Sequence, residues 1–297
     1  MPPAPSPAHT GALAPNETEH RLSRFPELDF PNDRTVHPSL RRPSASMNSR
    51  AVRLASILLA LFVTELRAQR PVLELDHFYI VIQRPPSRAA DALRHAGIVV
   101  DTAVTHHDGQ GTASVAAFFE NAYLELLWVD STIAVDSAHL SDLADFRRAT
   151  SWRDSGASPF GLGLHFLEGS ADDVPIPVRR EPAPHLGTEM FYLLLRRPEE
   201  PRAADLFVMP ARAAVTQWMD RFRGRRPNLF AHPLGARRIT RVTLHGSPAN
   251  RPGAMDLDLR SLGFAVATTQ YAIVEFDGAP QGREWDLRPV LPLVLRR

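Results

Sequence analysis

The strand predicted over Tyr123–Val129 is apolar on both of its faces except for one carboxylate, Glu125. A tight Glu120-Asn121 turn joins it to an earlier strand over Ala113–Phe119, and the two form a hairpin. Side chains alternate between the faces of a strand, which places Tyr123, Glu125, Leu127 and Val129 opposite Leu124, Leu126 and Trp128. An unpaired buried charge costs on the order of several kcal/mol. Glu125 therefore needs a cation, a metal ion or a proton.

The stretch Leu73–Ile82 predicts an earlier strand of the same kind, and its exceptional residue is His77. Alternation groups His77 on one face with Leu75, Tyr79 and Val81. A short helix over Ser87–His95 follows and ends at Gly97, because glycine tolerates the left-handed conformation that often closes a helix. Strand, helix, strand and hairpin thus make one unit.

Four short motifs occur in order within this unit. They are Leu75-Asp76-His77, Ala96-Gly97-Ile98, His107-x-Gly109-Gln110-Gly111-Thr112 and Tyr123-Leu124-Glu125-Leu126. Taken together, they resemble the glyoxalase-like branch of the vicinal-oxygen-chelate superfamily. The resemblance covers Leu73–Val129 and depends on the motifs in combination, since each one alone is short.

This resemblance implies an α+β fold in which repeated βαβββ modules form a cup from curved, mixed or antiparallel sheet. It also implies a divalent metal held by His and Glu from the first and last strands of each module. On this chain His77 and Glu125 take those positions, and His107 would lie at the mouth of the cup in a substrate-side catalytic role. Lyase, isomerase or dioxygenase chemistry on a small organic substrate with vicinal oxygens would follow.

A second set of strands is predicted over Phe160–Leu167, Glu189–Leu195 and Leu206–Met209. His165 stands in apolar surroundings on the first of them, so we expect it as the third metal ligand. The segment Val174–Pro184 is too rich in proline for a helix, which departs from the βαβββ pattern. Apolar spacing also predicts two helices, Ser137–Ala149 as a surface connection and Ala213–Phe222.

The last part of the chain contains a degenerate internal repeat of the first unit. Ile239–Leu244 parallels the His77 strand with Arg241 in place of the histidine, and Ser261-Leu262-Gly263-Phe264 parallels the end of the first helix. Glu275 in Ile273-Val274-Glu275-Phe276 matches Glu125 and is expected as a fourth ligand. We therefore expect one glyoxalase-like domain over 69–297, with modules at about 72–131, 158–210 and 236–297.

Composition removes several classes of chemistry. All 34 basic residues are arginine, and cysteine is absent. The chain therefore has no lysine Schiff base, Walker-type phosphate loop, thiol nucleophile or disulfide. The formal net charge of +1 gives no electrostatic reason to expect nucleic acid. The small-molecule partner that we expect is the one implied by the resemblance.

The N-terminal part predicts export. Residues 1–46 are rich in proline and lack apolar periodicity, which predicts disorder. Residues 47–68 have the pattern of a secretory signal peptide, with a basic start, the apolar run Leu54–Val63 and a small residue, Ala68. That run is too short to span a bilayer. We expect Met47 as the initiator and a periplasmic or secreted protein; a buried helix or an amphipathic presequence is the alternative.

Two functional classes remain. In a metal-dependent enzyme, His77, Glu125, His165 and Glu275 hold a divalent ion, while Glu125 and His107 act in catalysis. Two His and one carboxylate suit Fe or Mn, and an added Glu suits Zn or Ni. The alternative is a metal-free module that binds a small ligand. In that case Glu125 could pair with an arginine such as Arg241, and the histidines would be hydrogen-bonded core residues.

Overall fold

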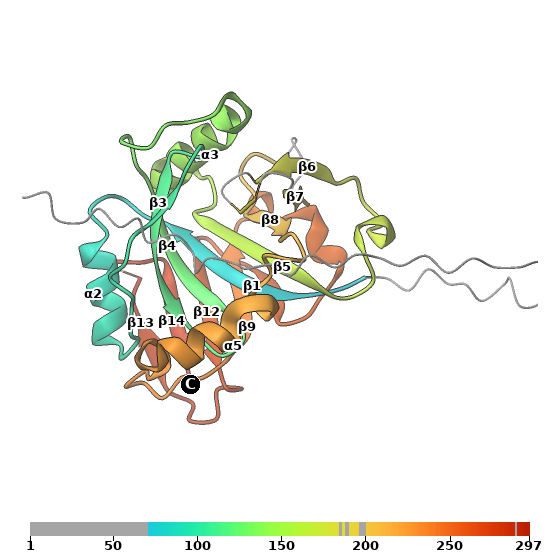
Figure 1. Cartoon of the computed structure of the whole chain (residues 1–297). Coiled ribbons are helices and arrows are strands. Elements are labelled where there is room, and N and C mark those ends of the chain that lie inside the picture. Colours follow the sequence, from blue (N-terminus) through green and yellow to red (C-terminus); the bar gives the residue numbers. More distant parts are fainter. Residues whose placement is uncertain (1–70, 184–185, 188–189, 196–199, 289) are drawn as a thin grey trace, which may run out of the picture.

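The computed structural model describes residues 71–297 except 184–185, 188–189, 196–199 and 289. The expected disordered segment 1–46 and signal peptide 47–68 lie outside the described residues. Two β-sheets and a few helices make the fold α+β, and the larger sheet is curled into a half barrel (Figure 1). Within the described part of the chain, no helix has the length and apolar content to cross a membrane.

The larger sheet has the strand order β2-β3-β4-β1-β5-β8-β7-β6, with a short ninth strand, β10, paired to the start of β1. The central strands β1 and β5 are antiparallel, β1 is parallel to β4, and β5 is parallel to β8. Its strands are β1 (Val72–Val81), β2 (Thr105–His107), β3 (Thr112–Phe118), β4 (Tyr123–Val129), β5 (Phe160–Glu168), β6 (Arg179–Pro182), β7 (Phe191–Leu194), β8 (Asp205–Val208) and β10 (Asp258–Leu259).

The hairpin β3-β4 folds with the predicted faces. Leu124, Leu126 and Trp128 lie in the main hydrophobic core, and Glu125 lies on the opposite, concave face. Val115 of β3 and Phe119, just after this strand, belong to the same core. Since one face of this hairpin packs entirely on apolar side chains, its register is fixed.

A β-bulge at Asp76 changes the face pattern of β1. Leu75 pairs with Leu164 and His77 pairs with Gly163, so Asp76 is an extra residue on this strand. Beyond the bulge Phe78 points into the core, and His77 lies on the concave face. Leu75 was expected to share the face of His77, but it belongs to the core because the bulge interrupts the alternation.

The segment 236–297 does not extend the half barrel as a third module of the cup. Apart from β10, its strands form a second sheet of order β11-β9-β12-β14-β13 that packs on the convex face of the first. The strands are β9 (Ile239–Gly246), β11 (Leu262–Val266), β12 (Tyr271–Phe276), β13 (Glu284–Asp286) and β14 (Leu293–Arg296). The segment around Gly263 was expected to end a helix, but it lies in strand β11.

Two helices border the concave face. Helix α5 packs Trp218 and Phe222 against Phe118 and Tyr123, so it covers one side of that face (Figure 1). Helix α3 was expected as a surface connection, yet its residues Asp142, Asp145 and Phe146 face the hollow of the sheet. The helices are α2 (Ser87–His95), α3 (Leu140–Thr150), α4 (Trp152–Ser155) and α5 (Val215–Arg225), with short 3-10 turns η1 (Ser137–His139), η2 (Ala171–Asp173), η3 (Pro227–Phe230), η4 (Pro248–Asn250) and η5 (Gly253–Asp256).

Candidate functional site

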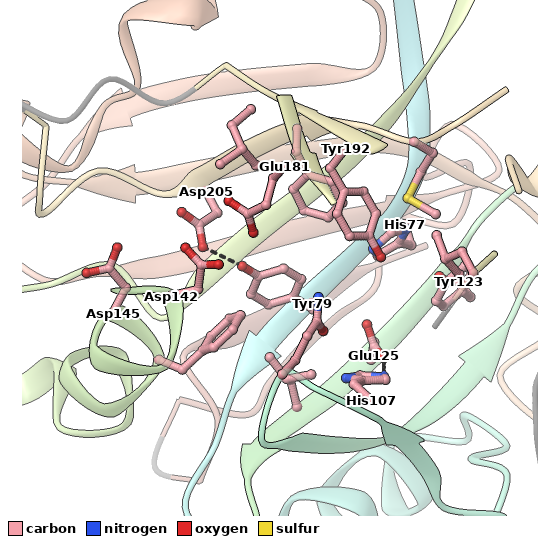
Figure 2. A pocket seen from close by; sticks show the side chains of 17 residues that line it. His77, Tyr79, His107, Tyr123, Glu125, Asp142, Asp145, Glu181, Tyr192 and Asp205 are labelled. Carbon is pink, nitrogen blue, oxygen red and sulfur yellow. Dashed lines mark hydrogen bonds and ion pairs between the residues drawn. The ribbon is translucent and has the colours of Figure 1, made fainter. Parts of the chain in front are cut away.

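The concave face encloses a cavity of about 110 Å³, several times the roughly 10–15 Å³ that one water molecule needs. Its chemistry is divided between two ends, with Tyr79 between them (Figure 2). We call one the histidine end, defined by His77, His107, Tyr123 and Glu125. We call the other the acidic end, defined by Asp142, Asp145, Glu181 and Asp205.

The bulged residue Asp76 fixes the imidazole of His77. Its Oδ1 lies 2.9 Å from His77 Nδ1, and its Oδ2 accepts a 2.6 Å hydrogen bond from the backbone N–H of Val215, the first residue of α5. A carboxylate only accepts hydrogen bonds, so His77 Nδ1 carries the proton. The lone pair of Nε2 is then available to a ligand. The ring of Tyr123 stacks on this imidazole at 4.6 Å between centroids.

Two glycines of β5 make room for rings of β1. A Cβ atom at Gly163 would overlap the imidazole of His77, and a Cβ at Gly161 would overlap the phenol of Tyr79. Both rings therefore occupy space that a side chain on β5 would fill. In this position the Tyr79 hydroxyl donates a 2.6 Å hydrogen bond to Asp205 Oδ2.

Glu125 and His107 form the acid–base pair of the histidine end. Glu125 Oε1 lies 3.4 Å from His107 Nε2, and both side chains are buried. His107 Nδ1 is 2.9 Å from Thr112 Oγ1, which orients the ring. Burial by itself would raise the pKa of Glu125. The hydrogen bond and charge of His107, the charge of His77 and a hydrogen bond from Ser114 outweigh burial, so that the pKa of Glu125 lies below its ordinary value.

Two phenols next to this pair remain protonated. Burial and then the charge of Glu125 raise the pKa of Tyr123 well above its ordinary value. The same two causes raise the pKa of Tyr192, which lines the cavity from β7. Both hydroxyls are therefore hydrogen-bond donors at neutral pH.

The structure does not bring the four expected metal ligands together. His77 and Glu125 line the cavity, but His165 does not, and its ring nitrogens lie 3.7 Å from Glu74 Oε2 and 3.8 Å from Asp76 Oδ2. Glu275 is on β12 in the second sheet, where its nearest ion-pair contact is Arg296 at 3.9 Å. The metal set implied by the resemblance therefore does not fit these residues, because His165 faces Glu74 and Asp76 and Glu275 lies in the second sheet.

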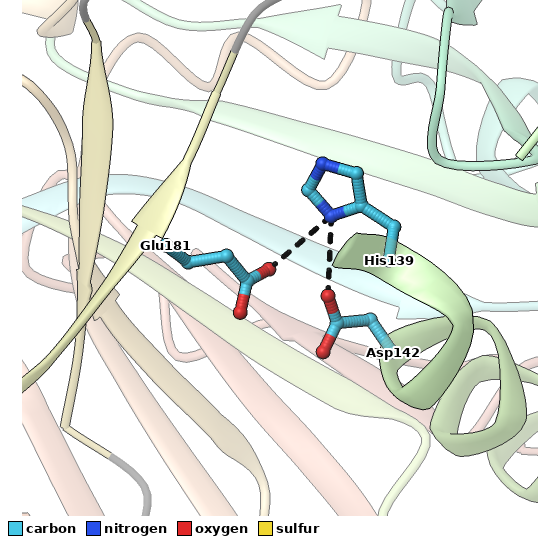
Figure 3. Close-up of side chains that lie close together, drawn as sticks. All are labelled: His139, Asp142 and Glu181. Carbon is cyan, nitrogen blue, oxygen red and sulfur yellow. Dashed lines mark hydrogen bonds and ion pairs between the residues drawn. The ribbon is translucent and has the colours of Figure 1, made fainter. Parts of the chain in front are cut away.

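A different group of side chains converges at the acidic end. His139 Nδ1 lies 3.3 Å from Asp142 Oδ2 and 3.5 Å from Glu181 Oε1 (Figure 3). Among the described residues, this is the group of three metal-ligating side chains whose ligand atoms all lie within 4.8 Å of one another. Burial, followed by the neighbouring Asp142 carboxyl, raises the pKa of Glu181 to about 8.

Sequence reasoning missed this second group. The spacing of His139 and Asp142 places them one helical turn apart on a segment predicted to be helical, which is a weak signal. Glu181 lies in the proline-rich segment that has no periodicity. Pairing of β6 with β7 places Glu181 opposite Tyr192 and so on the cavity wall.

No family model and no curated protein matches the chain. A solved structure of a hypothetical protein from Staphylococcus aureus is similar to it with a TM-score of 0.42 and 11% sequence identity. The match covers 76% of this chain and 99% of that chain. A likeness at this level carries no functional inference, so function has to be inferred from the cavity.

Proposed function

We propose that this protein is a glyoxalase-like enzyme of the lyase, isomerase or dioxygenase type, which acts on a small organic substrate with vicinal oxygens. One observation carries the proposal: the cavity holds a buried imidazole–carboxylate pair, His107 and Glu125, beside an imidazole fixed by Asp76. Buried acid–base groups that share a cavity are characteristic of catalytic sites.

The topology of the larger sheet supports the family part of the proposal. Counted outward from the centre, β1-β4-β3-β2 and β5-β8-β7-β6 follow the same order. The first half contains α2 between its first two strands, whereas η2 stands in that place in the second half. Two βαβββ-type modules, the second with its helix reduced to one turn, would produce this arrangement.

Proton abstraction next to a carbonyl is the chemistry that the histidine end supports best. Glu125 is ionised at neutral pH because its pKa is lowered, so it can take a proton from carbon. The negative charge then moves to the carbonyl oxygen, to which the protonated phenols of Tyr123 and Tyr192 can donate. His77 Nε2 can accept the proton of the adjacent hydroxyl and deliver it to the former carbonyl oxygen. Return of the first proton from Glu125 to the former carbonyl carbon completes an isomerisation, and both side chains regain their starting states.

Hydrogen–deuterium exchange tests this directly. Small 2-hydroxy aldehydes and ketones are incubated with the protein in deuterium oxide, and loss of the C–H signal next to the carbonyl is followed by NMR. We expect Glu125→Gln to slow exchange by about 100-fold or more, the usual range for loss of a general base. Glu275→Gln, which changes a carboxylate in the second sheet, is the matched control and should leave the rate unchanged.

A second candidate function is binding of a small organic ligand without chemistry. The aromatic and apolar part of the wall favours it, with Phe146, Phe207, Leu127 and Met209 around the polar ends. If compounds bind to the wild-type protein but show no hydrogen–deuterium exchange next to the carbonyl, this would support the binding function and contradict the enzymatic one. Equal exchange rates for the wild type and Glu125→Gln would instead remove Glu125 from the chemistry.

A further inference from the structure

The acidic end contains two carboxylates that face a single imidazole nitrogen. Oδ2 of Asp142 and Oε1 of Glu181 lie 3.3 and 3.5 Å from the same atom, His139 Nδ1. One ring nitrogen carries at most one proton, so it cannot donate a good hydrogen bond to both oxygens. Both contacts are also longer than the 2.7–2.9 Å that is usual for charge-assisted hydrogen bonds.

Arg179 does not complete the group, because it contacts the other oxygen of each carboxylate. Its Nη2 lies 3.0 Å from Glu181 Oε2 and 3.7 Å from Asp142 Oδ1. The oxygens that face His139 are thus left on the inner side. The side chain of Arg179 is 54% exposed, while those of His139 and Glu181 are 1% and 8% exposed. A guanidinium in this position orients the carboxylates from outside, as an outer-sphere partner does for metal ligands.

The separations match those between neighbouring ligand atoms of a tetrahedral ion. Bonds of about 2.0–2.1 Å to zinc, at tetrahedral angles, separate neighbouring ligand atoms by roughly 3.3–3.4 Å. The two measured separations from His139 Nδ1 are 3.3 and 3.5 Å. A catalytic zinc ion typically has three protein ligands and leaves one position open.

We propose that His139, Asp142 and Glu181 bind one zinc ion in the wall of the cavity. Asp142 and Glu181 line the cavity, whereas His139 lies behind them, so the open coordination position faces the cavity. The ligand class for that position is an oxygen donor such as a hydroxyl, carbonyl or carboxylate. The ion would also join α3, which follows the first four strands, to β6 on the other side of the cavity (Figure 3).

Zinc binding by the purified full chain tests the proposal without any need for an enzyme assay. Protein stripped with a chelator is titrated with zinc alone in competition with a chromophoric chelator. We expect one zinc per chain, with affinity at least about 10-fold lower in Asp142→Asn and in Glu181→Gln, since even loss of an outer-sphere partner costs this much. In crystals grown with zinc, an anomalous peak should lie about 2.0–2.2 Å from the three ligand atoms.

Asp145→Asn is the matched control. Asp145 is on the same helix, lines the same cavity and has a side chain 19% exposed, compared with 17% for Asp142. It should keep the wild-type zinc affinity, as should Glu125→Gln at the histidine end. An equal loss of zinc affinity in Asp145→Asn and Asp142→Asn would mean that zinc is attracted to acidic residues in general, and it would overturn the proposed site. A loss of zinc affinity in Glu125→Gln alone would overturn it as well. So would the absence of bound zinc on the wild type at about 100 μM zinc.

Thermal melting separates ligand loss from misfolding. In chelator, Asp142→Asn and Glu181→Gln should melt no lower than the wild type, because each removes one of two carboxylates that face each other. Added zinc should raise the melting temperature of the wild type and of Asp145→Asn, but not of the two ligand variants. A zinc-induced rise that is the same in all four proteins would place the ion elsewhere.

Discussion

Each end of the cavity contains one buried glutamate, and the pKa values of these two glutamates are shifted in opposite directions. The carboxylates of Glu125 and Glu181 are almost equally buried, with 7% and 8% of their side chains exposed. Imidazoles surround Glu125 and lower its pKa despite burial, whereas burial and the facing Asp142 raise the pKa of Glu181 to about 8. Because the two side chains are almost equally exposed, the neighbouring groups account for the opposite directions of the two pKa shifts.

We therefore propose a different role for each end of the cavity, proton transfer at the histidine end and zinc binding at the acidic end. The histidine end supplies an ionised base and fixed imidazoles, and the acidic end supplies the two facing carboxyl groups that we propose bind zinc. Tyr79, hydrogen-bonded to Asp205, lies between the ends (Figure 2). The variants below change the histidine end and should leave the zinc affinity of the acidic end unchanged.

The largest effect is expected from Gly163→Ala. The new Cβ would overlap the imidazole of His77, and relief requires the ring or β5 to move. Overpacking of this kind costs up to about 3 kcal/mol, measured as a loss of unfolding free energy in urea. Gly224→Ala on α5 is the control: nothing lies within 4 Å of its Cβ position, and a helical Gly→Ala change should stabilise by about 0.5–1 kcal/mol. If Gly163→Ala is as stable as the wild type, the close packing of His77 on β5 is incorrect.

The next effect is expected from Asp76→Ala. This change leaves the buried N–H of Val215 without its acceptor and releases His77 Nδ1. An unsatisfied buried donor costs about 1–3 kcal/mol, and we expect about 2 kcal/mol from urea unfolding. The control is Asp220→Ala on α5, the helix that begins at Val215. It removes a carboxylate that is 86% exposed and should change stability by less than about 0.5 kcal/mol. Equal effects of the two changes would show that Asp76 does not hold α5 in place.

The smallest effect is the pH dependence that Glu125 contributes. Its pKa in the folded protein is lower than the ordinary value of 4.5, so the native state binds fewer protons than the unfolded state in the acid range. The stabilisation is complete above the unfolded pKa and is lost as pH falls through the folded pKa. The difference in unfolding free energy between the wild type and Glu125→Gln should therefore shrink below about pH 4.5. A difference that stays constant between pH 3 and pH 7 would contradict the His107–Glu125 pairing.

Much of the larger sheet was predictable because its strands are long and strongly patterned. The faces of Tyr123–Val129 follow directly from apolar spacing, as does the helix predicted over Ala213–Phe222 and observed at Val215–Arg225. The helix Ser87–His95 was predicted from its closing glycine, Gly97. Apolar spacing also singled out Glu125 and His77, and the structure places both on the cavity wall. Each of them was recognisable as an isolated polar residue on an apolar strand.

The remaining features depend on contacts that a local pattern does not contain. A single extra residue, Asp76, reverses the alternation of β1 and therefore the position of Leu75. Glu275 matches Glu125 in its local sequence, but strand pairing places it in the other sheet, opposite Arg241. Glu181 needs both β6 and α3 in place before it faces Asp142. Its flanking prolines gave no periodicity from which to infer this.

The contact between Asp76 and Val215 has a kinetic consequence. It joins residues 139 positions apart in the chain, and β1 also pairs with β4, β5 and β10 along its length. Contacts of such large sequence separation form slowly, because the loop entropy has to be lost before they contribute stability. A chain that ends before α5 lacks the N–H donor that holds Asp76 Oδ2. We therefore expect the His77 imidazole to become fixed only after α5 packs on β1, late in folding.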